Sequence, residues 1–341
     1  MRKLTEQNIR HLKSHSKKHL RNRLKRKDKK YSGEGDISKR KSTNPTRDRI
    51  YFEDIEAPKK FNLKAENCEE FIAFVNKLKK YGLNRYNINI LMEETTDIGE
   101  GAISMFLSVI DELTKNGIGV IGTKPKLIVE RDKLEKSGFF KYMEGKIEAK
   151  NSITKNTILR TGGKSNTHID LSFEIKNANE TVWGTKGRNP PLRGTVFEMM
   201  RNSHDHAFKN ENSVIWHLGI SHDEESKQVK FSFVDNGRGI IKSFSEGFLG
   251  KLFNLFRDNC DLLETAFKNG IESRTGLSWR GKGLPTIFEN YEEGYFKNLV
   301  VISNDVFIDF DKKIYKKLNV PFKGTYYFWL LNEQCTKACY N

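Results

Sequence analysis

The sequence predicts an α/β protein with two folded parts, a small α/β domain followed by a larger α/β sandwich. Between residues 50 and 145, strand-like and helix-like segments alternate. After residue 195, one amphipathic helix precedes a run of alternating apolar residues that ends in a glycine-rich turn. The chain has 341 residues, which is long enough for two such domains, each with a sizeable core.

Residues 1–49 are expected to form a basic, flexible tail. They contain 18 Lys or Arg against 5 Asp or Glu, so +13 of the net charge of +16 lies there. Large apolar side chains are few, and such a segment does not bury enough surface to offset the entropy of ordering. The cluster of basic residues over 21–30 favours phosphate backbones through counterion release. Two roles are open for this tail: binding of nucleic acid, and simple solubilisation.

The composition predicts a cytoplasmic protein without membrane contact. No apolar run approaches the length of a membrane span, and no apolar segment follows the basic start of the chain. The four cysteines are scattered, which is typical of a reducing compartment. They are Cys68, Cys260, Cys335 and Cys339.

The segment 50–145 is predicted to form a small α/β layer sandwich. Its first residues, 51–61, supply one or two edge strands, and Asn67 has the character of a helix cap with an acid three residues on. The remaining elements alternate between strand and helix. Strands are expected over 86–92 and 117–121, and helices from 67 onward, over 101–113 and over 127–140.

Two short segments, 97–101 (DIGEG) and 136–139 (KSGF), frame the helices of this domain. With the order of elements, they make the domain similar to the STAS domain, the anti-anti-sigma fold. In that family a serine in the loop before the helix accepts phosphate, but Gly99 and Glu100 stand at the corresponding positions here. A phosphorylation switch is therefore not expected. Glu100 either supplies a fixed negative charge that mimics the modified form or caps the helix.

Residues 146–194 are expected to connect the two domains. The segment 162–165 (GGKS) resembles part of a phosphate-binding loop, but that loop needs a glycine five residues before Gly163, where Ile158 stands. A strand is expected over 168–175. Pro190 and Pro191 then end the connector just before the next helix.

Two segments carry the candidate chemistry. A helix over 195–208 places Glu198 and Asn202 one turn apart on the same side. A carboxylate beside an amide suits metal-assisted hydrolysis, because the first can act as a base for water and the second can offer oxygen to a hard cation. A strand over 229–234 then ends in the turn 235–239 (DNGRG), which begins with Asp235 and is rich in residues that tolerate positive φ.

With two further segments, 280–284 (RGKGL) and 323–325 (KGT), these sequences resemble the four motifs of the GHKL ATPases. That superfamily contains gyrase, heat-shock chaperones, histidine kinases and MutL. The resemblance implies a GHKL-type α/β sandwich over 195–333, a mixed sheet with helices on one face, which binds ATP and Mg²⁺. Residues 334–341 would form a C-terminal tail after this domain.

The resemblance also implies a role for each position. Glu198 would orient and deprotonate the attacking water, and Asn202 would hold Mg²⁺. Asp235 would accept a hydrogen bond from the adenine amino group, with Thr325 assisting through water. The remaining nucleotide contacts implied are Gly237, Gly239, Ile240, Gly281, Lys282, Gly283 and Leu284.

The segment around 271–285 is expected to act as a polar, mobile lid. Lys282 and Arg274 would either add positive charge to that lid or lie solvated beside it. Pro285 stands where the family usually has another glycine. Proline is tolerated at a helix start, because its missing N–H would be unpaired there in any case.

Within the superfamily, the residues favour a regulatory protein. Sensor histidine kinases usually carry Asn where Glu198 stands, whereas Glu198, Asn202 and His206 have the spacing of anti-sigma serine kinases. We therefore expect slow, Mg²⁺-dependent ATP hydrolysis coupled to conformational or partner switching. A serine/threonine protein kinase acting on a STAS-like partner, and a nucleic-acid-associated ATPase using the basic tail, are the alternatives. Because relatives pair through either domain, a protein partner or a homodimer is also expected.

Overall fold

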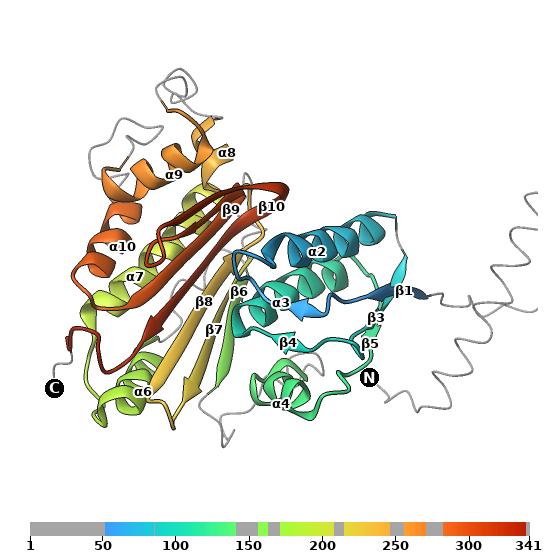
Figure 1. The fold of residues 1–341 in the computed structure, drawn as a ribbon, viewed down its shortest axis with the longest axis horizontal. Coiled ribbons are helices and arrows are strands. Elements are labelled where there is room, and N and C mark those ends of the chain that lie inside the picture. The colour runs from blue at the N-terminus through green and yellow to red at the C-terminus, as the bar shows by residue number, and fades with distance from the viewer. Residues whose placement is uncertain are drawn as a thin grey trace, which may run out of the picture.

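The chain folds as an α/β protein, as the sequence predicted (Figure 1). The computed structural model describes residues 52–84, 86–140, 156–162, 171–207, 215–245, 256–270 and 282–338. The basic tail 1–49 lies outside the described residues. We call residues 52–140 the middle domain, and Figure 1 shows it in blue and green against one side of a larger sheet.

The middle domain contains two small parallel sheets and three helices. Strands β1 (Phe52–Glu56), β3 (Asn87–Leu91) and β5 (Val120–Gly122) pair in the order β1-β3-β5, and β2 (Lys60–Phe61) pairs with β4 (Asp97–Ile98). The helices are α2 (Cys68–Leu83), α3 (Glu100–Lys115) and α4 (Ile128–Lys136). The predicted strands and helices of this segment are thus confirmed, with ends shifted by a few residues. Asn67 precedes α2, but its side chain does not cap the helix.

Among the described residues from 156 onward, one five-stranded sheet and its covering helices form the second part of the molecule. The strands are β6 (Thr157–Gly162), β7 (Ile215–Asp223), β8 (Gln228–Asp235), β9 (Lys297–Asp309) and β10 (Ile314–Leu331), in the order β6-β7-β8-β10-β9. The helices are α6 (Leu171–Trp183), α7 (Pro190–Asn202), α8 (Ile240–Ser245), α9 (Asn259–Lys268) and α10 (Gly283–Glu292), and a π-helical turn, Ser203–Ala207, continues α7.

The five-stranded sheet is antiparallel in every described pairing. The prediction of a mixed sheet here was therefore wrong, and the parallel pairs of the described residues all lie in the middle domain. Local connectivity accounts for two of these pairings, because β7–β8 and β9–β10 are hairpins and strands joined by short turns pair antiparallel.

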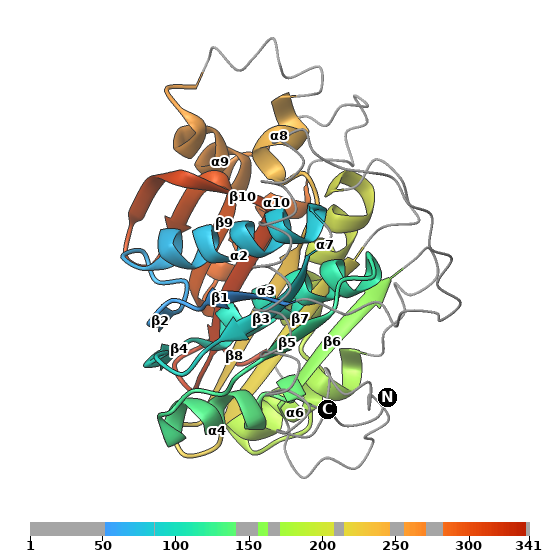
Figure 2. The same cartoon turned by 90° about the vertical axis from the view of Figure 1, so that its right-hand side faces the viewer.

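Both faces of this sheet are buried. Helices α6, α7, α9 and α10 lie on one face, and α2 and α3 of the middle domain lie on the other (Figures 1 and 2). Side chains alternate along each strand. Phe231 and Trp329 stack at 5.2 Å between ring centroids in the core beneath the first set of helices, whereas Val234 and Tyr326 belong to the core shared with the middle domain. Helices were expected on one face only, and the middle domain supplies the second layer.

Close contacts join the middle domain to the sheet. A Cβ at Gly219 would overlap Ser104 Oγ of α3, and Ser104 Oγ lies 2.8 Å from Ser232 Oγ of β8. The fully buried His217 of β7 places Nε2 3.0 Å from Asp111 Oδ2 of α3. The two parts of the chain therefore share one continuous core at this interface.

Two elements of the connector differ from expectation. The segment 168–175 was predicted as a strand, but from Leu171 it is helix α6. Leu171, Ile175, Ala178 and Val182 are all buried, and this helical spacing outweighs the short apparent alternation. Strand β6, which lies at the edge of the sheet beside β7, was not predicted.

Within the described residues, no helix has the length and apolar character needed to cross a membrane.

Candidate functional site

Helix α7 begins five residues before the predicted start. Pro190 and Pro191 occupy its first positions, where the missing N–H groups cost nothing, and Asn189 Oδ1 accepts a hydrogen bond from the Leu192 N–H at 3.1 Å. Val196 and Met199 are buried against the sheet. This packing fixes the rotation of the helix and leaves Glu198 and Asn202 at the start of α10.

Glu198 is a partly buried carboxylate with an ion-pair partner in its own helix. Its Oε2 lies 2.5 Å from an Nη atom of Arg201, in a geometry that does not make a hydrogen bond. Burial raises the pKa of Glu198, the Arg201 guanidinium opposes that rise, and Asp205 adds to it. A raised pKa brings a carboxyl group closer to the range of a useful general base. The sequence predicted Glu198 but not its partner Arg201, although the spacing of three residues is typical of helical ion pairs.

The start of α10 lies directly against Glu198 and Asn202. A Cβ at Gly283 would come within 2.8 Å of Glu198 Oε2 and 3.0 Å of Asn202 Oδ1. Asn202 Nδ2 is buried without a hydrogen-bond partner among the described residues. Further along α10, Asn290 Nδ2 donates to Thr195 Oγ1 of α7 at 3.0 Å. The helix that carries the predicted base, α7, and the helix that begins at the predicted phosphate-binding segment, α10, are therefore held together.

Asp235 ends β8 with its carboxylate buried on the face of the sheet that α6, α7, α9 and α10 cover. Oδ2 accepts a hydrogen bond from Ser203 Oγ at 3.0 Å, and Oδ1 accepts one from the Gly237 N–H at 2.8 Å. Burial raises the pKa of Asp235 to about 6, and these two hydrogen bonds limit the rise. Ser203 immediately follows α7, so it joins the helix of Glu198 to the carboxylate of Asp235. The sequence did not predict this serine.

The glycine turn after Asp235 is held by residues of β9. Gly239 has φ +83°, and a Cβ there would lie 2.5 Å from Asn304 Oδ1. Asn304 Nδ2 donates to the Arg238 carbonyl at 2.8 Å, and its Oδ1 accepts from the Lys242 N–H at 3.1 Å. The Ile240 N–H donates to Ser303 Oγ at 2.7 Å. Ser303 and Asn304 were not predicted, because no local pattern marks a residue that binds a turn more than sixty positions away.

Thr325 lies directly opposite Asp235 in the pairing of β10 with β8. Opposite residues share a face, so the buried Thr325 side chain lies on the same side of the sheet as the carboxylate. Gly324 precedes it at φ +139°, and a Cβ there would overlap the Asp235 carbonyl oxygen. This close approach explains the glycine of the 323–325 segment.

The remaining predicted contacts divide into two groups. Lys282 is exposed beside the start of α10, and Leu284 packs partly against the core. Arg274 and Gly281 lie outside the described residues, as does the side chain of His206. The predicted lid is therefore represented in the structure by its final residues only.

The oxygen atoms of Asn202 and Glu198 are suited to a nucleotide that binds as its Mg²⁺ complex. Asn202 offers an amide oxygen and Glu198 a carboxylate, which are ligand types that Mg²⁺ accepts. No cluster of three or more His, Cys, Asp or Glu in the described residues could hold a metal by itself. Mg²⁺ at Asn202 would thus share its coordination with phosphate oxygens and water, as is usual for this ion. The space at Gly283 is too narrow for a side chain beside Glu198 and Asn202.

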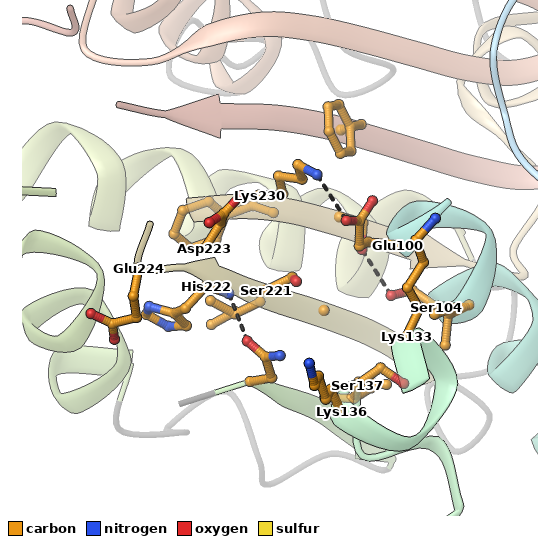
Figure 3. Close-up of a pocket in the computed structure, with 18 of the residues that line it drawn as sticks. Glu100, Ser104, Lys133, Lys136, Ser137, Ser221, His222, Asp223, Glu224 and Lys230 are labelled. Atoms are coloured by element: carbon orange, nitrogen blue, oxygen red, sulfur yellow. Dashed lines mark hydrogen bonds and ion pairs between the residues drawn. The ribbon is translucent and has the colours of Figure 1, made fainter. Parts of the chain in front are cut away.

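A hollow of about 450 Å³ lies on the face of the sheet opposite to the Asp235 carboxylate. Figure 3 shows its walls: α3 and α4 of the middle domain on one side, and the β7–β8 hairpin on the other. Lys230 Nζ pairs with Glu100 Oε1 at 2.8 Å, and His222 Nδ1 lies 2.8 Å from Thr181 Oγ1. Its lining contains none of the predicted nucleotide contacts that the structure describes. It is the open end of the domain interface.

In comparisons with known proteins, no family model matches this chain and no curated protein is significantly similar to it.

Proposed function

We propose that this chain is an ATP-binding regulatory protein of the GHKL class, with slow, Mg²⁺-dependent hydrolysis coupled to conformational or partner switching. The observation that carries the proposal is the meeting of Gly283 with Glu198 and Asn202, beside the hydrogen bond from Ser203 to Asp235. Segments that lie far apart in the sequence and resemble the GHKL motifs adjoin at one end of the sheet, through those of their residues that the structure describes.

Each residue then has a chemical task. Asp235 accepts a hydrogen bond from the adenine amino group, and this contact distinguishes adenine from guanine. Thr325 lies beside Asp235 on the same face of the sheet. Backbone N–H groups at the start of α10 bind phosphate oxygens. Glu198 takes a proton from the attacking water, and its raised pKa supports that task. Bound Mg²⁺ supplies neutralisation of charge at the phosphates, with Asn202 as its protein ligand.

We also propose that the middle domain is STAS-like and acts as the regulatory part. Its parallel strands and amphipathic helices support this reading. Glu100 does not cap α3, because Gly99 occupies the cap position and no side-chain cap bond is formed. Instead, Glu100 Oε1 pairs with Lys230 Nζ of β8 at 2.8 Å, so its charge ties the domain to the sheet.

Calorimetry of the full chain with Mg²⁺ and adenylyl-imidodiphosphate tests the proposal. We expect saturable heat from the wild type and much weaker binding by Asp235→Asn. The absence of any heat with the wild type would overturn the proposal.

The fate of the γ-phosphate separates the two enzymatic readings. With γ-labelled ATP, label released as free phosphate supports hydrolysis. Label retained on the chain, or on an added STAS-like protein, supports the protein kinase alternative instead.

A further inference from the structure

Asp235 and Asn236 are adjacent but serve opposite layers of the molecule. The Asp235 carboxylate accepts a hydrogen bond from Ser203 on the face of the sheet that α7 covers. The Asn236 side chain lies on the other face, where its Nδ2 donates to the Ser108 carbonyl of α3 at 3.0 Å. Its Oδ1 accepts from Lys79 Nζ of α2 at 3.2 Å and from Ser108 Oγ at 3.4 Å. Both partners of Asn236 belong to the middle domain. The turn 235–237, which is proposed to contact adenine, is therefore held in place by hydrogen bonds to the middle domain.

Lys79 is firmly fixed in this position. Its side chain is only 15% exposed, and Nζ lies 3.0 Å from Glu112 Oε2 of α3. The ammonium also lies over the Phe322 ring of β10, 5.8 Å from the centroid. Burial lowers the pKa of Lys79 and the Glu112 carboxylate counteracts that effect; Lys323 and Asp235 are the other charged groups that act on it. An ammonium with these contacts loses little further freedom when it binds Asn236.

We propose that Lys79 is a positioning residue for the nucleotide, because it holds Asn236 and thereby sets the shape of the turn from Asp235 to Gly237. This inference rests on the proposed function. The backbone link is direct: the Gly237 N–H that follows Asn236 donates to Asp235 Oδ1. If the peptide of Asn236 reorients, the Gly237 N–H moves with it, and the carboxylate loses one of the two hydrogen bonds that orient it, while the bond from Ser203 remains.

The arrangement also links nucleotide binding to docking of the middle domain. If docking through Lys79 improves the site for adenine, then bound adenine nucleotide must strengthen docking by the same factor. The middle domain would thus report whether the site is filled, without touching the nucleotide.

The decisive variant is Lys79→Met in the full chain, titrated with Mg²⁺ and the non-hydrolysable analogues of ATP and of GTP. We expect the affinity for the ATP analogue to fall about tenfold, the effect of one lost charge-assisted hydrogen bond. The weaker affinity for the GTP analogue should stay the same, because guanine has no amino group at the position that Asp235 reads. The preference for adenine should therefore shrink. Lys79→Arg, which keeps the charge and a donor, should restore much of it.

Lys316→Met is the matched control. Lys316 of β10 also crosses the domain interface, where Nζ lies 2.7 Å from Glu69 Oε1 and donates to the Ala65 carbonyl at 3.1 Å. These hydrogen bonds do not reach residues 235–237. We expect this variant to bind both analogues as the wild type does.

Hydrogen exchange at the Gly237 amide provides a reading without nucleotide. Lys79→Met should accelerate that exchange and Lys316→Met should not. If Lys79→Met does not fold, Asn236→Ala removes the Lys79 contact together with the bonds to Ser108, so it should change affinity and exchange in the same direction and at least as much. The inference would be overturned if Lys79→Met lost affinity equally for both analogues, or if its affinity for the ATP analogue were unchanged. Unchanged exchange at the Gly237 amide would also overturn it. A wild type that binds no nucleotide would overturn the proposed function, while the exchange data would still decide whether Lys79 positions the turn.

Discussion

A hydrogen bond of 3.0 Å from Ser203 Oγ to Asp235 Oδ2 connects the end of helix α7 to the end of strand β8. Both groups are buried, and the bond favours the ionised carboxylate. The helix that carries the candidate base and the strand that carries the candidate adenine contact are therefore fixed to each other by one serine.

This bond makes nucleotide affinity depend on pH. Burial raises the pKa of Asp235 to about 6, and protonation removes one of the acceptor sites that Ser203, Gly237 and adenine would share. We expect ATP affinity, measured by calorimetry, to fall as the pH decreases through about 6. Ser203→Ala should move this fall to higher pH, because the bond that lowers the pKa is lost. Asp235→Asn should bind weakly at every pH, and a fall of equal size in that variant would contradict the assignment.

Stability of the ligand-free protein should change in the opposite direction. The folded pKa of Asp235 lies above its ordinary value of 3.8, so its contribution to stability is fully present below 3.8 and is lost as the pH rises through about 6. Thermal unfolding of wild type and Asp235→Asn across this range measures the difference between the two proteins. A difference that stays constant with pH would exclude a raised pKa.

Glu198→Ala should separate binding from turnover. The variant loses the group that accepts the proton from water, so we expect phosphate release to fall by about 10²–10⁴-fold. Calorimetric affinity for adenylyl-imidodiphosphate should change little. Equal phosphate release by Glu198→Ala and wild type would remove Glu198 from the role of base.

Gly283→Ala should impair turnover without unfolding the protein. The new Cβ would meet the ends of two side chains, Glu198 Oε2 at 2.8 Å and Asn202 Oδ1 at 3.0 Å, and both can shift slightly. Such small displacements of catalytic groups cost up to about 10²-fold in rate. Gly194→Ala is the control, because it lies in α7 with nothing within 4 Å of its Cβ position. Phosphate release by the control should match the wild type, and a similar loss in both variants would argue against a specific contact at Gly283.

Asn304→Ala should destabilise the glycine turn. It would remove the hydrogen bonds that Asn304 makes to the Arg238 carbonyl and the Lys242 N–H, at a cost of about 1–3 kcal/mol in the free energy of unfolding. Asn298→Ala controls for the backbone, since both asparagines have φ +55° but Asn298 is exposed. Denaturant unfolding of the two variants isolates the side-chain bonds. Equal losses would mean that Asn304 acts through its backbone conformation alone.

Much of the fold could be predicted because its signals are local. The helical spacing of apolar residues in α2 and α3, and the alternation in β8, are properties of short segments. The connector was harder to predict, because β6 becomes a strand only by pairing with β7. The order of the large sheet also depends on tertiary contact: β7–β8 and β9–β10 are hairpins, but β8 pairs with β10 across a long stretch of sequence.

The candidate site was predicted in its motifs but not in its supports. Glu198, Asn202 and Asp235 stand in segments with recognisable spacing. Ser303, Asn304 and Lys79 do not, because each acts on a turn that is distant in sequence. Their contribution arises from tertiary contact, which no pattern in a single chain reveals.

The alternation of β8 has a consequence for variation in this chain. Asp235 faces the helices because it lies an even number of residues from Phe231 and Phe233, and Asn236 follows on the reverse side. Deleting or inserting one residue within β8 would exchange the two, so that the amide would face the proposed nucleotide site and the acid would face Lys79. The bend at 224–227 can lengthen without such an exchange. We therefore expect natural insertions to be tolerated at that bend and to be absent between Gln228 and Asp235.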